Sequence, residues 1–386
     1  MKDDSQASSP RMRSVRYAVV SLAALVVLSL GFALVPAENP APAQPPFTEV
    51  ARAAALEDAM DLRAAGMELA AAGTVDAASV DPVVTLLTIQ ARALLAPAAA
   101  GGQAGIGTTA PASASPAATP ASGLPKPTPT SAQEGMSGLA SALVASGTKR
   151  IKDAQEADGG MARLLAGTGT AQLLAAARLA AAAGAPVAPA DPGPVAAVPV
   201  PAETGPSCPA VPAAESTGPG GTGPEGTGQG GTGPGAALAA ALAAEQQAVY
   251  GYQAALPRLG AADAGTALTY LGQHDDLLQA AEARLPLVCA TAAPQQPGYA
   301  LDARFLAAPA AGLGRLEAAT MAAYGDLVAL SQGTVRAWAL AALQSAAGRA
   351  ARWGADPGPV PGLPLDVDRL PGLPSGPAQA PSPTAT

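Results

Sequence analysis

The chain has 386 residues, of which 43 are glycine and 40 are proline, so a large part of its length is expected to be linker. A formal net charge of -8, on a charged fraction of 13%, argues against a nucleic-acid-binding surface, which needs a basic face. Aromatic residues make up 3% of the chain, and both tryptophans and five of the six tyrosines come after residue 235. We therefore expect the packed core in the last third of the chain.

The first predicted element is an uncharged apolar run from Ala18 to Val35, preceded by Arg11, Arg13 and Arg16. Its length nearly spans the hydrocarbon core of a bilayer. Arginines on its N-terminal side favour a cytoplasmic N-terminus and export of everything that follows. The sequence therefore predicts an N-terminal segment that directs the chain to the membrane.

Residues 1–16 are predicted as the cytoplasmic N-terminus and residues 17–36 as a transmembrane anchor, with a signal peptide as the alternative. Both interpretations place the bulk of the chain outside the cytoplasm, either on the cell membrane or secreted. The two cysteines, Cys208 and Cys289, would then lie where disulfides form. One disulfide between them is a candidate, and two unpaired cysteines are the alternative.

Two helical segments and two linkers follow. Residues 47–96 are predicted to hold two helices, the second beginning at Pro82 because proline suits a first turn. The other helical segment covers residues 132–184, with breaks at Gly147 and at Gly159–Gly160. These segments form either a second helical domain or a loose stalk. The linkers, which lack the large apolar side chains of a core, are residues 97–131 and 185–235.

The last third is predicted to be a four-helix bundle over residues 236–356, followed by a Pro-rich tail at 357–386. The connections are short between the first and second helices and between the third and fourth, and longer in between. Two antiparallel hairpins joined by a longer loop make such a bundle. The predicted fold class is all-α. The four predicted helices cover residues 236–256, 262–287, 309–331 and 334–353.

Each of these four helices carries an apolar seam at steps of three and four residues, typical of the inward face of a bundle. A charged or titratable residue falls on each seam: Glu245, His274, Glu317 and Arg349. His274 is the only histidine of the chain. For the third helix a neighbouring stripe through Leu316 fits almost as well, which would put the glutamate on the flank. A carboxylate on a seam is costly to bury unless it is paired or ligated, so these four residues are the candidate site.

Three sequence runs in this region carry a family resemblance: AEQQAVYGYQAALPRL, RLEAATMAAYGDLV and AAGRAARWGADPGPVPGLP. They resemble a ferritin-like domain family of unknown function, of the DUF4439 type, which is similar to envelope proteins of high-GC Gram-positive bacteria. The resemblance covers about residues 236–365. It implies a ferritin-like bundle and does not imply ferritin activity.

A di-iron bundle takes one glutamate from each of two helices and a Glu-x-x-His pair from each of the other two. Glu245 and Glu317 match the lone glutamates, and His274 matches one histidine. The position three residues before His274 is Leu271, and the fourth helix offers no ligand pair. An intact di-iron site is therefore not expected. A single iron held by Glu245, His274 and Glu317 is the alternative.

We instead expect Arg349 to replace the lost metal by pairing with Glu245 or Glu317, which leaves His274 as a hydrogen-bonded core histidine. A nucleophilic triad or a phosphate loop has no residues to build from. The sequence thus favours a non-enzymatic helical module without a cofactor, tethered to the membrane and acting in binding or envelope structure. The alternatives are an iron-binding or oxidase-like protein and a carrier of an apolar ligand in the bundle core. The sequence does not name a protein partner.

Overall fold

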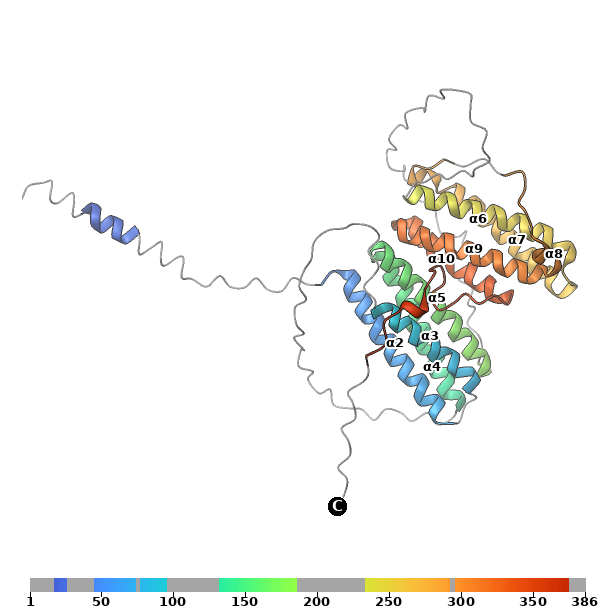
Figure 1. Ribbon diagram of the computed structural model, residues 1–386, viewed down its shortest axis with the longest axis horizontal. Helices are drawn as coiled ribbons and strands as arrows, with labels where there is room; N and C mark the ends of the chain where they lie inside the picture. Colours follow the sequence, from blue (N-terminus) through green and yellow to red (C-terminus); the bar gives the residue numbers. More distant parts are fainter. Residues whose placement is uncertain are drawn as a thin grey trace, which may run out of the picture. The chain divides into compact units, whose positions relative to one another are not determined.

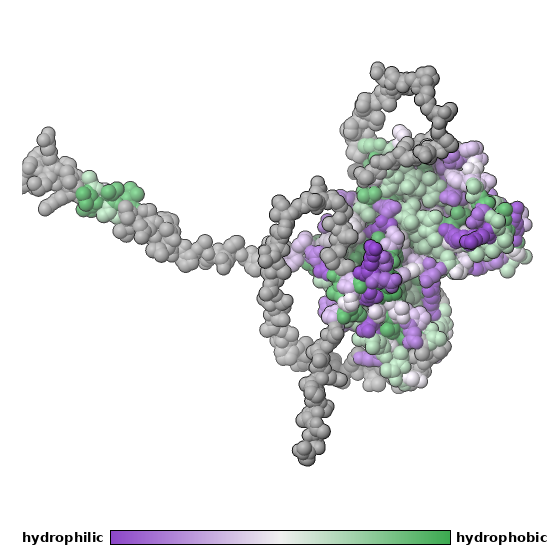
Figure 2. Space-filling model, in the orientation of Figure 1, coloured by the Kyte–Doolittle hydropathy of each residue, from purple (hydrophilic) through white to green (hydrophobic). Residues whose placement is uncertain are grey.

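The computed structural model describes residues 17–25, 45–73, 77–95, 132–185, 233–291 and 296–374. The chain divides into two compact units, Met1–Pro45 and Pro46–Thr386. In the first unit, residues 17–25 form a helix whose apolar side chains are exposed. Figure 2 colours this helix as hydrophobic. The three arginines before the predicted anchor, and the anchor beyond residue 25, lie outside the described residues.

All regular structure in the described residues is helical, which confirms the predicted all-α class (Figure 1). The second unit begins with four helices, which we call the first helical group. Within it, α2 packs against α3 and α4, and α4 packs against α5. The predicted segments 47–96 and 132–184 are therefore packed helices rather than a loose stalk. The helices of this group are α2 (Phe47–Ala71), α3 (Ala77–Leu95), α4 (Ala132–Glu156) and α5 (Gly159–Ala182).

Two sequence-based expectations for this group are wrong. Helix α3 begins at Ala77, so Pro82 lies inside the helix, where it removes one N–H near the start without ending it. Helix α4 runs without a break through Gly147, and the chain turns only at Ala157 and Asp158. Gly147 allows close approach instead, because a Cβ placed there would lie 2.9 Å from the carbonyl oxygen of Gly169 in α5.

Helices α6 to α10 form the second helical group. Helix α6 packs against α7 and α9, and α9 packs against α10. The short helix α8 was not predicted. Helix α7 is shorter than the helix predicted for residues 262–287, because a 3₁₀ turn, Leu285–Val288, follows it. The helices are α6 (Pro234–Ala255), α7 (Ala261–Glu282), α8 (Ala303–Ala307), α9 (Pro309–Leu330) and α10 (Gly333–Arg352).

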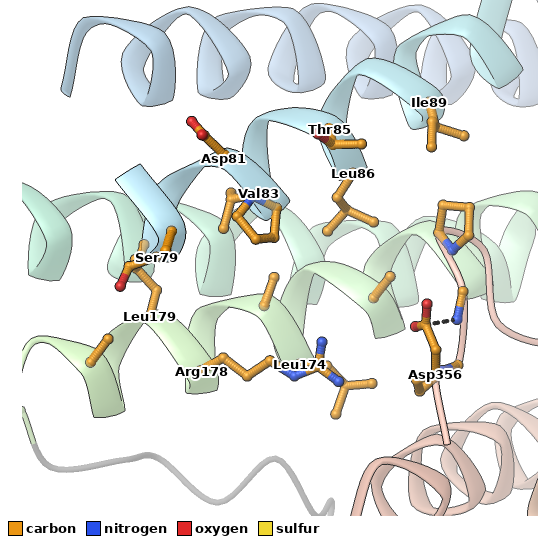
Figure 3. Close-up of a pocket in the computed structure, with 18 residues that line it drawn as sticks. Ser79, Asp81, Val83, Thr85, Leu86, Ile89, Leu174, Arg178, Leu179 and Asp356 are labelled. Carbon is orange, nitrogen blue, oxygen red and sulfur yellow. Dashed lines mark hydrogen bonds between the residues drawn. The ribbon is translucent and has the colours of Figure 1, made fainter. Parts of the chain in front are cut away.

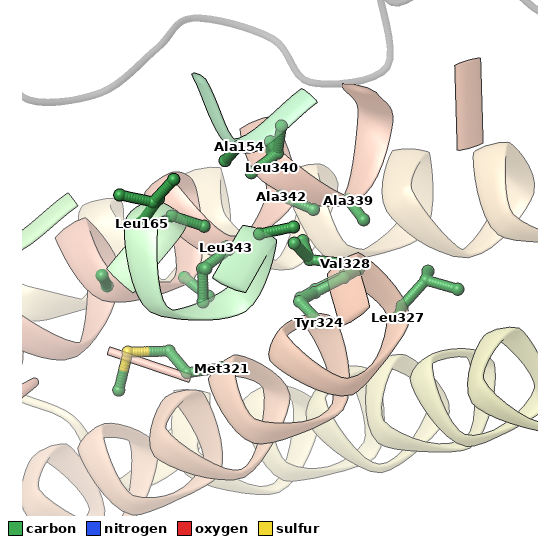
Figure 4. Packing of buried hydrophobic residues seen from close by; sticks show 14 of the residues in the cluster. Ala154, Leu165, Met321, Tyr324, Leu327, Val328, Ala339, Leu340, Ala342 and Leu343 are labelled. Carbon is green, nitrogen blue, oxygen red and sulfur yellow. The ribbon is translucent and has the colours of Figure 1, made fainter. Parts of the chain in front are cut away.

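The two groups share one hydrophobic core, which contains Ala154 and Leu165 from the first and Tyr324 and Leu343 from the second (Figure 4). Helix α5 lies against α9 and α10. Polar bonds add to this contact: the guanidinium of Arg336 in α10 donates to the carbonyl oxygen of Ala157 at 2.7 Å. Both groups therefore belong to one packed body.

Residues 357–374 pack against the helices, although the sequence predicts a Pro-rich tail from 357 onward. We call them the strap. Val360 is buried, and the side-chain amide of Gln90 in α3 donates to the carbonyl oxygen of Pro359 at 2.9 Å. The guanidinium of Arg163 in α5 donates to the carbonyl oxygen of Gly362 at 2.7 Å. The strap thus joins the end of α10 to the first helical group.

In the part of the chain that the structure describes, one helical stretch is long and apolar enough to cross a membrane by length and composition: Ala78–Leu95, in α3. The core helices of packed proteins meet the same two criteria. Leu87 and Leu94 of this stretch are fully buried among the other helices.

Candidate functional site

The four candidate residues come from four different helices and meet in the interior of the second helical group. Glu245 is on α6, His274 on α7, Glu317 on α9 and Arg349 on α10, and none of them is more than 2% exposed. The seam spacing explains this, because residues at steps of three and four share one face of a helix. Leu316 is only partly buried, so Glu317 lies on the seam and not on its flank.

His274 lies between the two glutamates. Its Nδ1 is 2.6 Å from Oε2 of Glu245, and its Nε2 is 2.9 Å from Oε1 of Glu317. Ionised carboxylates only accept hydrogen bonds, so both contacts are satisfied when both ring nitrogens carry a proton. Burial alone lowers the pKa of His274, but the carboxylates of Glu317 and Glu245 raise it above its usual 6.5. The geometry therefore stabilises an imidazolium.

Arg349 pairs with Glu317. Its Nε donates to Oε2 at 2.9 Å and to Oε1 at 3.0 Å, and its Nη1 donates to the hydroxyl of Ser345 at 2.7 Å. Burial alone raises the pKa of Glu317, but the charges of Arg349 and His274 together lower it to about 2. Glu317 is thus an ionised carboxylate held between two cations. Glu245, the other predicted partner of Arg349, bonds to His274 instead.

Two tyrosines also bond to the glutamates, each to the glutamate of the other helix. Tyr252 on α6 donates to Oε1 of Glu317 on α9 at 2.6 Å, and Tyr324 on α9 donates to Oε1 of Glu245 on α6 at 2.7 Å. Trp353 in turn donates from Nε1 to the hydroxyl of Tyr252 at 2.6 Å. Sequence reasoning assigned no role to these aromatic residues. The available signal was a repeated spacing, because each glutamate is followed by a tyrosine seven residues later.

We call these residues the charge network. Its two carboxylates, one imidazolium and one guanidinium carry no net charge. Every carboxylate oxygen accepts at least one hydrogen bond from a protein donor. The network is therefore charge-balanced, and among its buried polar atoms only Nη2 of Arg349 lacks a hydrogen-bond partner in the described residues. It stabilises four helix interiors that would otherwise hold isolated charges. The network consists of Glu245, Tyr252, His274, Glu317, Tyr324, Ser345, Arg349 and Trp353.

This donor set does not fit a metal centre. A metal ligand must offer a free lone pair, yet both nitrogens of His274 point at carboxylates and Arg349 brings a positive charge to Glu317. Leu271 stands where a Glu-x-x-His pair needs its carboxylate. Within the described residues no group of three or more His, Cys, Asp or Glu side chains is arranged to hold a metal ion.

All residues of the charge network lie in one part of the chain. A family described as a domain of unknown function, DUF4439, matches residues 237–365. No curated protein and no solved structure matches the chain. The matched domain contains every residue of the charge network and the first part of the strap, whereas α2 to α5 lie outside it.

The predicted disulfide has one cysteine in the described residues. Cys289, directly after the 3₁₀ turn that follows α7, is disulfide-bonded. Cys208 lies outside the described part of the chain. Their pairing with each other stays a prediction.

Proposed function

We propose that this protein is a non-catalytic helical module of the cell envelope, tethered to the membrane by its N-terminal segment. The matched domain is then a degenerate ferritin-like four-helix bundle made by α6, α7, α9 and α10. In it, the guanidinium of Arg349 takes the place of the lost metal, and His274 keeps the position of one ligand histidine. The module acts through its surfaces and its shape rather than through chemistry at its centre.

The observation that carries this proposal is the buried, charge-balanced network. A catalytic centre needs a reactive group or a coordination position that a substrate can reach. Here each carboxylate oxygen is hydrogen-bonded to the protein, and Glu245, His274 and Glu317 are completely buried. Such an arrangement stabilises one packing of the helices and leaves no carboxylate oxygen without a protein donor.

Two features support the envelope location. The described helix of residues 17–25 is apolar and exposed, as an anchor or a leader would be. The disulfide at Cys289 is typical of proteins that fold outside the cytoplasm. Membrane fractionation of the producing cells, followed by protease treatment of intact spheroplasts, tests this location. Protection of the chain from external protease would overturn it.

The second candidate function is an iron-binding or oxidase-like protein, favoured only by the presence of two glutamates and one histidine in the core. Metal analysis of the full chain, purified without chelator, separates the two. We expect well under half an equivalent of any transition metal, and the same low value in Glu245→Gln. Roughly half an equivalent of iron or more, lost in Glu245→Gln but kept in Glu282→Gln on the surface of α7, would overturn the non-catalytic proposal.

A further inference from the structure

A groove of about 730 Å³ lies between α3 and α5, at the end of α10 where the strap begins (Figure 3). This volume falls in the range of small-molecule sites. Its lining on α3 extends from Ala78 to Ile89, a length of roughly 17 Å at about 1.5 Å per residue. None of its lining residues belongs to the charge network, so the groove is independent of the centre of the matched domain.

The lining is predominantly apolar. Val83 and Leu86 from α3 face Leu174 and Leu179 from α5 in Figure 3. A bound peptide would bring backbone N–H and C=O groups that need hydrogen-bond partners, and the lining offers few polar side chains to supply them. An alkyl chain needs no such partners. The groove therefore suits an extended hydrocarbon chain better than a polypeptide.

Arg178 is the one cationic side chain among the residues that line the groove, and it is exposed. Arg178 makes no ion pair or side-chain hydrogen bond within the described residues, and its side chain runs along α5 toward Leu174 (Figure 3). The two carboxylates of the lining are disposed differently. Asp356 accepts a hydrogen bond from the backbone N–H of Gly358 at 3.0 Å, and Asp81 points away from α5. The lining thus carries two carboxylates and one guanidinium, and the guanidinium is the charged group that runs along the apolar side chains of α5.

We propose that this groove binds a single-chain anionic amphiphile, such as a long-chain fatty acid. Its alkyl chain lies between α3 and α5, and its carboxylate pairs with Arg178. A planar guanidinium binds a carboxylate through two parallel hydrogen bonds, which fixes the position of the head group. The site goes beyond the envelope role proposed above, and it stands or falls independently of the charge network.

Calorimetric titration of the full chain with laurate, below its micelle concentration, tests the proposal. Lauryl alcohol serves as the uncharged probe of equal chain length. We expect laurate to bind the native protein, and Arg178→Gln to weaken laurate binding about tenfold or more while leaving the binding of the alcohol unchanged. Leu86→Asp should abolish the binding of both probes. Arg258→Gln, on an arginine outside the groove, is the matched control and should bind laurate as the native protein does.

Three results would overturn the proposal: no binding of laurate to the native protein, equal binding of laurate to the native and Arg178→Gln proteins, or Arg178-dependent binding to anionic vesicles without binding to laurate. The third would assign Arg178 to a bilayer surface instead. Circular dichroism of each variant shows that it is folded before it is titrated. A metal-containing protein that still binds laurate through Arg178 would overturn the non-catalytic proposal and leave this one standing.

Discussion

Each helical group buries an arginine that pairs with a carboxylate, Arg150 in the first and Arg349 in the second, and the partners of the two arginines differ in their exposure. In the second group the carboxylate of Glu317 that pairs with Arg349 is 0% exposed, so both charges are sealed from water. In the first group Arg150 is also 0% exposed and has two partners. Asp58, 3.0 Å away, is 41% exposed, whereas Asp153, 3.3 Å away, is 11% exposed and also pairs with Lys149 at 2.8 Å. The two ion pairs thus differ in whether water reaches a carboxylate that pairs with the buried arginine.

The groups also differ in how their helices approach each other. Helices α4 and α5 of the first group cross at Gly147 and Gly169, where each glycine faces the backbone of the other helix. The second group brings charged and aromatic side chains together at its centre instead. The difference suggests that backbone packing specifies the first group and polar bonding specifies the second.

The largest loss of stability should come from removing the guanidinium of the buried Arg349–Glu317 pair. We expect Arg349→Leu to lower the free energy of unfolding by about 3–5 kcal/mol, because Glu317 would remain buried and charged without its guanidinium. Urea denaturation followed by circular dichroism measures the change. Arg352→Leu in the same helix is the control, since its partner Asp263 is 3.5 Å away and both side chains are more than a third exposed. We expect that variant to lose less than about 1 kcal/mol. Equal losses for the two variants would show that the sealed pair contributes nothing special.

The second largest loss of stability should come from removing the imidazolium of His274. A glutamine at position 274 carries no positive charge to offset the two buried glutamates, so we expect His274→Gln to lower stability by about 2–4 kcal/mol in mildly acidic buffer. The loss should depend on pH. Because the folded pKa of His274 is raised above 6.5, its contribution is complete below 6.5 and disappears as pH rises through the folded pKa.

The ionisation of Glu317 sets the lower pH limit of the stability that the charge network provides. Its pKa is lowered from 4.5 to about 2, so its contribution is complete above 4.5 and disappears as pH falls through about 2. Both contributions are therefore complete between pH 4.5 and 6.5. Urea denaturation over a pH series should show the gap between the native protein and His274→Gln narrowing as pH rises above that window. A gap that widens instead would mean that a neutral histidine is the stabilising form.

A smaller effect should come from the glycine crossing of the first group. A Cβ at position 169 would lie 2.6 Å from the carbonyl oxygen of Gly147, so α4 and α5 must separate to accept it. We expect Gly169→Ala to lower the free energy of unfolding by about 1–3 kcal/mol. Gly138→Ala in α4 is the control, because nothing lies within 4 Å of its added Cβ. That variant should gain about 0.4–1 kcal/mol, and a loss at both positions would remove the argument for backbone packing.

The sequence allowed prediction of the second group's centre because a helical period assigns each residue to a face. That is sufficient to place Glu245, His274, Glu317 and Arg349 together in the interior. It is not sufficient to predict which side chain bonds across to which helix. The crosswise bonds of Tyr252 and Tyr324 depend on the offset between α6 and α9, which no single helix encodes.

The first group was less predictable for a related reason. A glycine in a helical pattern has two interpretations, a break or a close approach, and the choice depends on the helix that packs against it. At Gly147 the partner is α5, more than twenty residues later in the chain, so the local sequence favoured a break. The strap was misjudged in the same way, because proline and glycine indicate irregular backbone but not whether that backbone packs against a core.

The smallest effect is expected at Arg150, and it is the most direct test of the comparison between the groups. Removing this guanidinium leaves Asp58 in contact with water and leaves Asp153 paired with Lys149 at 2.8 Å. No carboxylate is stranded in the interior, so Arg150→Leu should cost about 1 kcal/mol or less, although the arginine is as buried as Arg349. Urea denaturation beside Arg349→Leu gives the ratio of the two losses. If Arg150→Leu cost as much as Arg349→Leu, the exposure of the partner carboxylate would not be what separates the two groups. A several-fold smaller loss would show that burying the arginine is tolerated as long as its partner stays hydrated.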